Sequence, residues 1–223
     1  MATVTHATRE EMICRVRGVR RPAGRTVVVQ LERPRIDFEP GQYVNVGFPE
    51  EIDMREYSVY SGPEDELLEI LVRHVDHGLI SPRLDRVQAG DHLQVEGPFG
   101  FFTIPEEIRG ESFLWVSTGT GIAPFRSFVR AYPRLDYHLL HGVRRSGELY
   151  DWHEYEPDRR TACVSREGGG GFHGRVTEYL RLHPVDPGTY CYLCGNADMI
   201  YEVYDILQNQ GIEPDRIHAE VYF

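Results

Sequence analysis

The stretch from residue 54 to residue 62 reads MREYSVYSG and predicts a short strand that ends at a Gly-Pro turn. Arg55 and Tyr57 are two residues apart, so they share one face of this strand, whereas Ser58 lies on the other. An arginine fork can hold a diphosphate, a tyrosine can lie against a flat ring, and a serine can meet a ring nitrogen. The set suits a flavin nucleotide held where the strand ends or bulges. The alternative is an ordinary barrel strand with a solvated arginine.

Short β-rich runs separated by glycine and proline turns fill residues 12–100 around this stretch. The predicted strands are residues 13–20, 26–32, 42–48, 56–61, 67–75 and 92–97. Six antiparallel strands that close on one another make a small barrel. We therefore predict an antiparallel β-barrel domain over residues 1–106.

A helix-like piece at residues 81–86 interrupts these strands just after His77-Gly78-Leu79-Ile80-Ser81. A glycine followed by a helix start presents free backbone N–H groups and the positive end of the helix dipole, which together attract an anion. A diphosphate could dock at this turn. Alternatively, Ser81 only caps the helix ahead of Pro82.

The hydrophobic pattern changes after residue 110. The run FLWVS at residues 113–117 is continuously apolar, which is typical of a strand buried on both faces. Further runs at 137–141, 161–165, 190–194 and 217–221 alternate with helical patterns, which predicts a parallel sheet with right-handed crossovers. The expected fold therefore has two domains, the β-barrel and then an α/β parallel-sheet domain over residues 107–223.

The first strand of this second half runs into the loop TGTGIAP at residues 118–124 and then into a helix at 125–131. Gly119 and Gly121 allow the backbone to approach a phosphate at the edge of the sheet where ligands of α/β proteins bind. Pro124 stands where the dinucleotide-binding fingerprint has its third glycine, so the loop differs from the standard NAD motif. A tight turn without a ligand is the alternative.

No acidic residue that could bind a ribose follows the glycine loop at the expected distance, where the sequence has Leu140, His141 and Gly142. Arginines appear instead at the ends of the next predicted strands. They are Arg144, Arg145, Arg166 beside Ser165, and Arg175. The ribose phosphate of NADP would require such cations, and NAD lacks that phosphate. Scattered surface charge is the alternative interpretation.

Composition limits the class of protein. The chain has 223 residues, 41% hydrophobic and 26% charged, as in soluble globular proteins, and its net charge of −11 argues against a binder of nucleic acid or anionic membrane. We find no signal peptide or membrane-span pattern, and four scattered cysteines agree with a reducing compartment, so we expect a cytoplasmic protein.

Cys191 and Cys194 fall on opposite faces of a predicted strand, so we expect no metal there. Eight arginines between residues 9 and 35 make either a docking patch for an acidic partner or a solvated strand face.

Together these motifs resemble the ferredoxin/flavodoxin NADP reductase family, and its bacterial branch in particular. The resemblance covers residue 11 to the last residue. It rests on Arg55-Glu56-Tyr57-Ser58, residues 77–84, residues 118–124, residues 164–167 with Gly174-Arg175, Cys194-Gly195-Asn196, and the terminal residues 219–223. Two departures are Ala197, where the family usually has proline, and an acidic net charge in a protein expected to meet an acidic ferredoxin.

The resemblance implies roles for individual residues. Tyr57 and Tyr222 are expected on either side of the flavin ring, Ser58 near its N5 atom, and Thr120 at its edge. Ser58, Cys194 and Glu220 are the expected catalytic residues at the hydride-transfer site. The other residues expected at the two cofactors are Arg55, Glu56, Leu71, Gly78, Leu79, Ile80, Ser81 and Phe223 for FAD, and Thr118, Gly119, Thr120, Gly121, Arg144, Ser165, Arg166 and Arg175 for NADP(H).

The implied function is that of a monomeric, FAD-dependent reductase. It would pass hydride between NADP(H) and flavin N5, and single electrons to or from ferredoxin or flavodoxin. One alternative is the reductase component of an oxygenase or a free-flavin reductase, although the sequence shows no cysteine cluster for a fused iron–sulfur domain. Another is a flavin electron-relay subunit of a complex, which would not need arginines for NADP.

Overall fold

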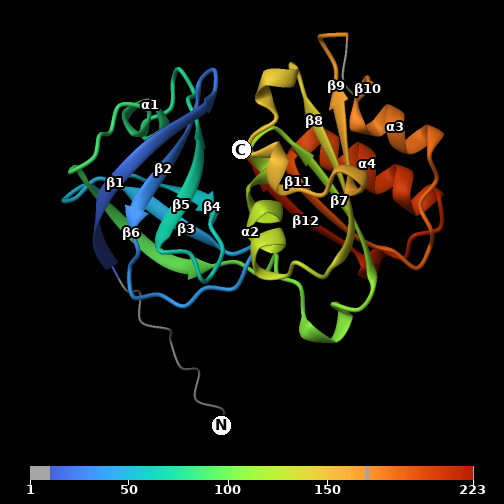
Figure 1. The fold of residues 1–223 in the computed structure, drawn as a ribbon, viewed down its shortest axis with the longest axis horizontal. Coiled ribbons are helices and arrows are strands. Elements are labelled where there is room, and N and C mark those ends of the chain that lie inside the picture. The colour runs from blue at the N-terminus through green and yellow to red at the C-terminus, as the bar shows by residue number, and fades with distance from the viewer. Residues whose placement is uncertain (1–10, 169–170, 223) are drawn as a thin grey trace.

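The computed structural model describes residues 11–168 and 171–222, which fold into two six-stranded sheets side by side (Figure 1). The first sheet is antiparallel, in the order β4-β3-β6-β1-β2-β5. Its strands are β1 Glu11–Ala23, β2 Thr26–Glu32, β3 Tyr43–Gly47, β4 Met54–Ser58, β5 Leu67–Arg73 and β6 His92–Phe99. The predicted antiparallel barrel is confirmed, with each predicted strand overlapping an observed one.

The barrel closes at one end only. The terminal strands β4 and β5 are joined by an isolated bridge between Val59 and Ile70, and no other pairing connects them in the described part of the chain. Alternate residues of the strands, such as Val27, Val29 and Leu31, fill the apolar interior. The outer edge of β4 is left open along most of its length.

The predicted helix after residue 80 is a single turn, α1 Ser81–Leu84. Ser81 does not cap it, which corrects one sequence interpretation. Ile80 occupies the N-cap position, and the Ser81 hydroxyl instead accepts the backbone N–H of Val75 at 3.1 Å. The serine therefore stabilises the turn that precedes the helix.

The second sheet is parallel throughout, in the order β10-β9-β8-β7-β11-β12. Its strands are β7 Ser112–Thr118, β8 Asp136–Val143, β9 Arg160–Val164, β10 Phe172–His173, β11 Tyr190–Asn196 and β12 Ile217–Tyr222. The helices are α2 Ala123–Ala131, α3 Val176–Leu182 and α4 Ala197–Asn209. Short 3-10 turns lie at Glu106–Ile108, Gly119–Ile122, Ser146–Glu148, Trp152–Glu154, Pro157–Arg159 and Pro214–Arg216. The predicted parallel sheet is confirmed.

Both faces of this sheet are covered. Helix α2 lies between the sheet and the barrel, whereas α3 and α4 cover the far face (Figure 1). Along β7, Trp115 packs in the cluster on the barrel side and Val116 in the cluster under α3 and α4. Cys194 and Cys191 on β11 divide between the same two clusters, so the prediction that they lie on opposite faces is confirmed.

The two halves share an apolar core. Val28, Tyr60 and Leu71 of the barrel pack in one cluster with Trp115 and Phe125 of the second half. The predicted domain division between residues 106 and 107 lies between the end of β6 and the start of β7, and stays a prediction. Among the residues described, no helix is both long enough and apolar enough to cross a membrane.

Candidate functional site

Two cavities open where the halves meet. The larger, of about 1050 Å³, follows the open edge of β4, and the smaller, of about 650 Å³, lies at the carboxyl ends of the parallel strands. Arg73, Thr120 and Tyr222 line both cavities. The two spaces therefore adjoin at these three side chains.

Strand β4 forms one wall of the larger cavity, which is lined by all four residues of the predicted motif, Arg55, Glu56, Tyr57 and Ser58. Tyr57 pairs with Val44 of β3 and packs on the barrel core, and this burial raises the pKa of its hydroxyl. The Arg55 side chain is exposed and donates to the carbonyl of Met54 at 3.0 Å. Its guanidinium still has donors directed to solvent, as an anion site requires.

The opposite wall comes from β5 and from the turn before α1. Leu71 and the turn residues Gly78, Leu79, Ile80 and Ser81 all line the larger cavity, as predicted from the sequence. A Cβ built on Gly78 would lie 2.9 Å from the Ser81 hydroxyl oxygen, so a larger residue here would displace the hydroxyl that accepts from Val75. The turn lines the same cavity as Arg55 and Tyr57.

A chain of hydrogen bonds lies at the junction of the cavities. The Tyr222 hydroxyl donates to Ser58 Oγ at 2.6 Å, and Ser58 Oγ donates to Glu220 Oε1 at 2.6 Å. Burial raises the pKa of the Glu220 carboxyl, and the Ser58 hydrogen bond partly offsets that effect. These bonds join β4 of the barrel to β12 of the second sheet, over a sequence separation of more than 160 residues.

The Cys194 side chain lies behind this junction and not on a cavity wall. It is fully buried, it lines neither cavity, and burial raises the pKa of its thiol well above the usual value. Its neighbours include Tyr222 and Glu220. The predicted contact of Phe223 with the flavin falls outside the described residues.

The predicted glycine loop lies at the mouth of the smaller cavity. Thr118, Gly119 and Thr120 line it, and Gly119 has a positive φ of 55°. Gly121 lies just beneath, where a Cβ would overlap the carbonyl of Cys194, so this position also requires glycine. The Thr118 hydroxyl accepts the backbone N–H of Asn196 at 3.1 Å, which joins the loop to the start of α4.

The predicted cations gather in the same cavity. Arg144 follows β8, Ser165 and Arg166 follow β9, and Arg175 precedes α3; all four are exposed and line the smaller cavity. Arg145 does not line it and lies 3.9 Å from Glu167. Three arginines from different strand ends therefore surround one space, as an anionic group on a ligand would require.

Sequence reasoning missed several lining residues. Arg73, which lines both cavities, is two residues beyond Leu71 on the same strand face, and that spacing was the available signal. Tyr43, Asn45 and Glu96 line the larger cavity from β3 and β6. They come together only through strand pairing, which residue patterns within one strand do not reveal.

The amino-terminal arginines, considered as a docking patch, are largely engaged within the molecule. The ion pairs are Arg17 with Glu32, Arg20 with Asp151, Arg21 with Asp85 and Arg25 with Asp76. Arg33 donates to the carbonyl of Asp65 at 3.0 Å. These contacts neutralise much of the local charge, which favours a structural role for the cluster.

Comparisons with protein families match both halves of the chain. The model described as "Oxidoreductase FAD-binding domain" matches residues 23–104, and that described as "Oxidoreductase NAD-binding domain" matches residues 115–205. A ferredoxin–NADP reductase of Azotobacter vinelandii is 31% identical over 216 residues, which cover 81% of this chain and 82% of that protein. The reductase subunit of an aromatic O-demethylase of an Amycolatopsis species is 30% identical, over 89% of this chain and 64% of its own length. The chain thus spans less than two thirds of that relative.

Solved structures have the same fold. A cytochrome P450 reductase of Amycolatopsis matches with a TM-score of 0.84 and 29% identity, over 99% of this chain and 73% of that one. A ferredoxin NADP+ reductase of Neisseria gonorrhoeae with bound FAD and NADP matches with a TM-score of 0.85 and 24% identity, over 96% and 99% of the two chains. The two-domain architecture is therefore shared with both proteins, one of which was crystallised with FAD and NADP.

Proposed function

Because this chain belongs to the ferredoxin–NADP reductase family of FAD- and NAD(P)-binding oxidoreductases, we propose that it passes hydride between NADP(H) and FAD, and single electrons between FAD and ferredoxin or flavodoxin. The meeting of two cavities at Arg73, Thr120 and Tyr222 carries this proposal. Hydride transfer requires the two reacting rings to be in contact, and the shared wall is where two bound cofactors would touch.

The larger cavity is proposed as the FAD site. Its volume of about 1050 Å³ is slightly above the usual range of about 300–1,000 Å³ for ligand pockets, which suits a dinucleotide. Arg55 offers donors for the diphosphate, and Tyr57 offers a flat face for the ring system. When bound, the flavin would supply the chemistry, taking hydride from the nicotinamide and releasing electrons singly.

The hydrogen-bonded chain at the junction is proposed to transfer protons and to control the entry of nicotinamide. Ser58 lies between the Tyr222 hydroxyl and the Glu220 carboxylate, so a proton can move along these three groups without entering bulk water. The raised pKa of Glu220 brings that carboxyl closer to the pH at which it can take or return a proton. Tyr222 forms part of both walls, so we assign it the role of a gate that moves when nicotinamide enters.

The smaller cavity is proposed as the NADP(H) site, with preference for NADPH over NADH. Arg144, Arg166 and Arg175 would pair with the 2′-phosphate, and the Ser165 hydroxyl would donate a hydrogen bond to it. Gly119 and Gly121 would keep the backbone close to the diphosphate. A flavin electron-relay subunit would have no use for such a cationic site, which makes that alternative less favoured.

The reductase component of an oxygenase is the second candidate function. The matched relatives include reductase components of aromatic O-demethylase and naphthalene dioxygenase systems, of which the chain covers 64%. We favour a ferredoxin or flavodoxin as partner because a relative that the chain covers over 82% of its length is a ferredoxin–NADP reductase. We propose a monomer.

One experiment tests these proposals together. The purified chain is loaded with FAD and mixed with NADPH and, in turn, with a ferredoxin, a flavodoxin and an oxygenase component. Rapid reduction of a ferredoxin or flavodoxin supports the main proposal, and reduction of the oxygenase component alone supports the second. Failure of the FAD-loaded chain to oxidise NADPH contradicts both and leaves the relay subunit.

A further inference from the structure

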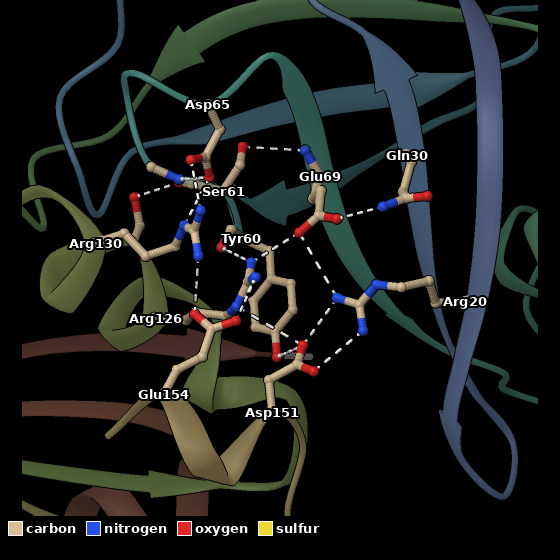
Figure 2. Close-up of polar contacts among 12 residues, drawn as sticks. Arg20, Gln30, Tyr60, Ser61, Asp65, Glu69, Arg126, Arg130, Asp151 and Glu154 are labelled. Atoms are coloured by element: carbon tan, nitrogen blue, oxygen red, sulfur yellow. Dashed lines mark hydrogen bonds and ion pairs between the residues drawn. The ribbon is translucent and has the colours of Figure 1, made fainter. Parts of the chain in front are cut away.

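A buried arginine joins the two halves of the molecule (Figure 2). Arg126 lies on α2 and is 5% exposed. Its guanidinium donates to the Tyr60 carbonyl at 2.7 Å, to Glu69 Oε2 at 2.7 Å, and to Glu154 Oε1 at 2.8 Å. It also lies 4.3 Å from the centroid of the Tyr60 ring. Tyr60 and Glu69 belong to the barrel, so one side chain binds both halves.

The place of these contacts along the chain gives them significance. Tyr60 is two residues after Ser58, the last residue of β4, and Arg126 is two residues after the glycine loop at 118–124. The arginine therefore connects the segment that leaves the proposed flavin strand to the helix that begins at the proposed nicotinamide loop. Tyr60, Glu69 and Arg126 do not line either cavity. Ser58 lines the larger cavity, and residues 118–120 of the glycine loop line the smaller one.

Two further contacts hold the same segments together. The Ser127 hydroxyl donates to the Ser61 carbonyl at 2.8 Å, and both groups are buried. A Cβ built on Gly62 would lie 3.0 Å from the Cβ of Arg130, so α2 packs directly on the backbone of the 60–62 segment. The contact leaves little space for sliding between the halves.

The ion pairs around Arg126 favour one orientation of the barrel relative to the second half. Three arginines, Arg20, Arg126 and Arg130, face four carboxylates, as Figure 2 shows. The carboxylates are Asp65, Glu69, Asp151 and Glu154. Three of these ion pairs cross between the halves: Arg126 with Glu69, Arg20 with Asp151, and Arg130 with Asp65. Separating partly buried charges from their partners is unfavourable, so a shift of one half against the other would cost free energy at all three pairs.

We propose that Arg126 is a positioning residue for hydride transfer: by binding the 60–62 segment to α2, it sets the separation between the flavin and nicotinamide sites. This proposal rests on the proposed function. The planar guanidinium bonds acceptors in several directions, which a lysine ammonium at the end of a flexible chain does not reproduce. A misplacement of about 1 Å between reacting groups can reduce a rate by about a hundredfold.

The test compares Arg126→Lys with Arg159→Lys in the FAD-loaded full chain. Arg159 is a matched control because it donates to the carbonyl of Leu135 at 2.7 Å within the second half, and neither residue lines a cavity. Three quantities are measured: the rate of flavin reduction at saturating NADPH, the long-wavelength absorbance that appears with NADP+, and hydrogen–deuterium exchange at residues 59–62 and 123–131 without nucleotide.

For Arg126→Lys we expect reduction about a hundredfold slower, a weaker long-wavelength band and faster exchange at both segments. Flavin content and NADPH affinity should stay as in the wild type, because Arg126 lines neither cavity. Arg159→Lys should match the wild type in every measurement. A merely structural role would lower the melting temperature and leave the rate and the band of the holoenzyme unchanged, which would overturn the proposal.

Two milder variants keep the proposal testable if Arg126→Lys does not fold. Glu69→Gln removes one charge and keeps the shape of the side chain, and Ser127→Ala removes one hydrogen bond between the halves. Both should slow reduction and increase exchange in the same segments, and wild-type values in both would overturn the proposal. Failure of the proposed function is distinguishable, because it appears as a wild-type chain that does not take hydride from NADPH.

Discussion

Replacing Arg166 by alanine should weaken binding of NADPH and leave binding of NADH unchanged. Arg166 follows β9 and lines the smaller cavity together with Arg144 and Arg175. NADPH differs from NADH only in the 2′-phosphate, so a side chain that binds that phosphate affects one cofactor and not the other.

The magnitude follows from the exposure of the side chain. A hydrogen bond to a charged group contributes about 1.5–3 kcal/mol, and the lower value applies here because Arg166 is exposed and water screens the pair. A loss of about 1.5 kcal/mol corresponds to about a tenfold rise in the dissociation constant of NADPH. The loss should shrink as salt is added, since the Debye length falls from about 10 Å at 0.1 M to about 3 Å at 1 M.

The assay is titration of the FAD-loaded protein with each nucleotide, followed by steady-state kinetics with both. Arg145→Ala is the matched control, because it removes the adjacent arginine, which lies 3.9 Å from Glu167 and outside the cavity. If Arg166→Ala affects NADPH no more than Arg145→Ala does, or weakens NADH equally, the assignment of the smaller cavity is wrong.

Two further predictions test other parts of the site, and a third tests a buried histidine that lines neither cavity. Arg55→Ala should lose FAD during gel filtration, and retention of full flavin absorbance would contradict the proposed diphosphate contact. Removing Tyr222 and Phe223 should tighten nicotinamide binding and narrow the preference for NADPH, because a wall shared by both cavities is gone; unchanged affinities and no new long-wavelength absorbance would exclude a gate. Burial lowers the pKa of His141 from 6.5 to about 3, so the unfolded chain binds a proton that the folded chain does not, and the free energy of unfolding should fall as the pH drops from 6.5 toward 3. One proton changes the free energy of unfolding by at most about 1.4 kcal/mol per pH unit. Urea unfolding at several pH values should show a weaker pH dependence in His141→Gln than in the wild type. An unchanged dependence would show that other groups cause the acid sensitivity.

The strands were predictable because their patterns are local. Residues 113–117 are apolar at every position, and the structure places Trp115 and Val116 in clusters on opposite faces of the sheet. The same alternation of side chains along a strand correctly predicted that Cys191 and Cys194 lie on opposite faces of the sheet. Strand β10, Phe172–His173, was not predicted, because two residues carry no periodicity.

The site was predictable where motifs follow one another along the chain. The residues from Arg55 to Ser58 and from Gly78 to Ser81 line one cavity, and their contact with FAD stays a prediction. Burial of the Cys194 side chain was not predictable, because the segments packed against Cys194, namely β12 and the glycine loop, are distant from it in the sequence. The network of Arg126 gave no sequence signal either, since its barrel partners are 57 and 66 residues away.

The open edge of β4 has a consequence for producing the protein. Backbone groups along an unpaired strand edge can pair with another chain, which makes such edges starting points for aggregation. In the part of the chain that the structure describes, only the bridge from Val59 to Ile70 joins this side of the barrel to β5. FAD bound in the larger cavity would cover the edge, so we expect cells that are short of riboflavin to yield more insoluble protein than cells supplied with it.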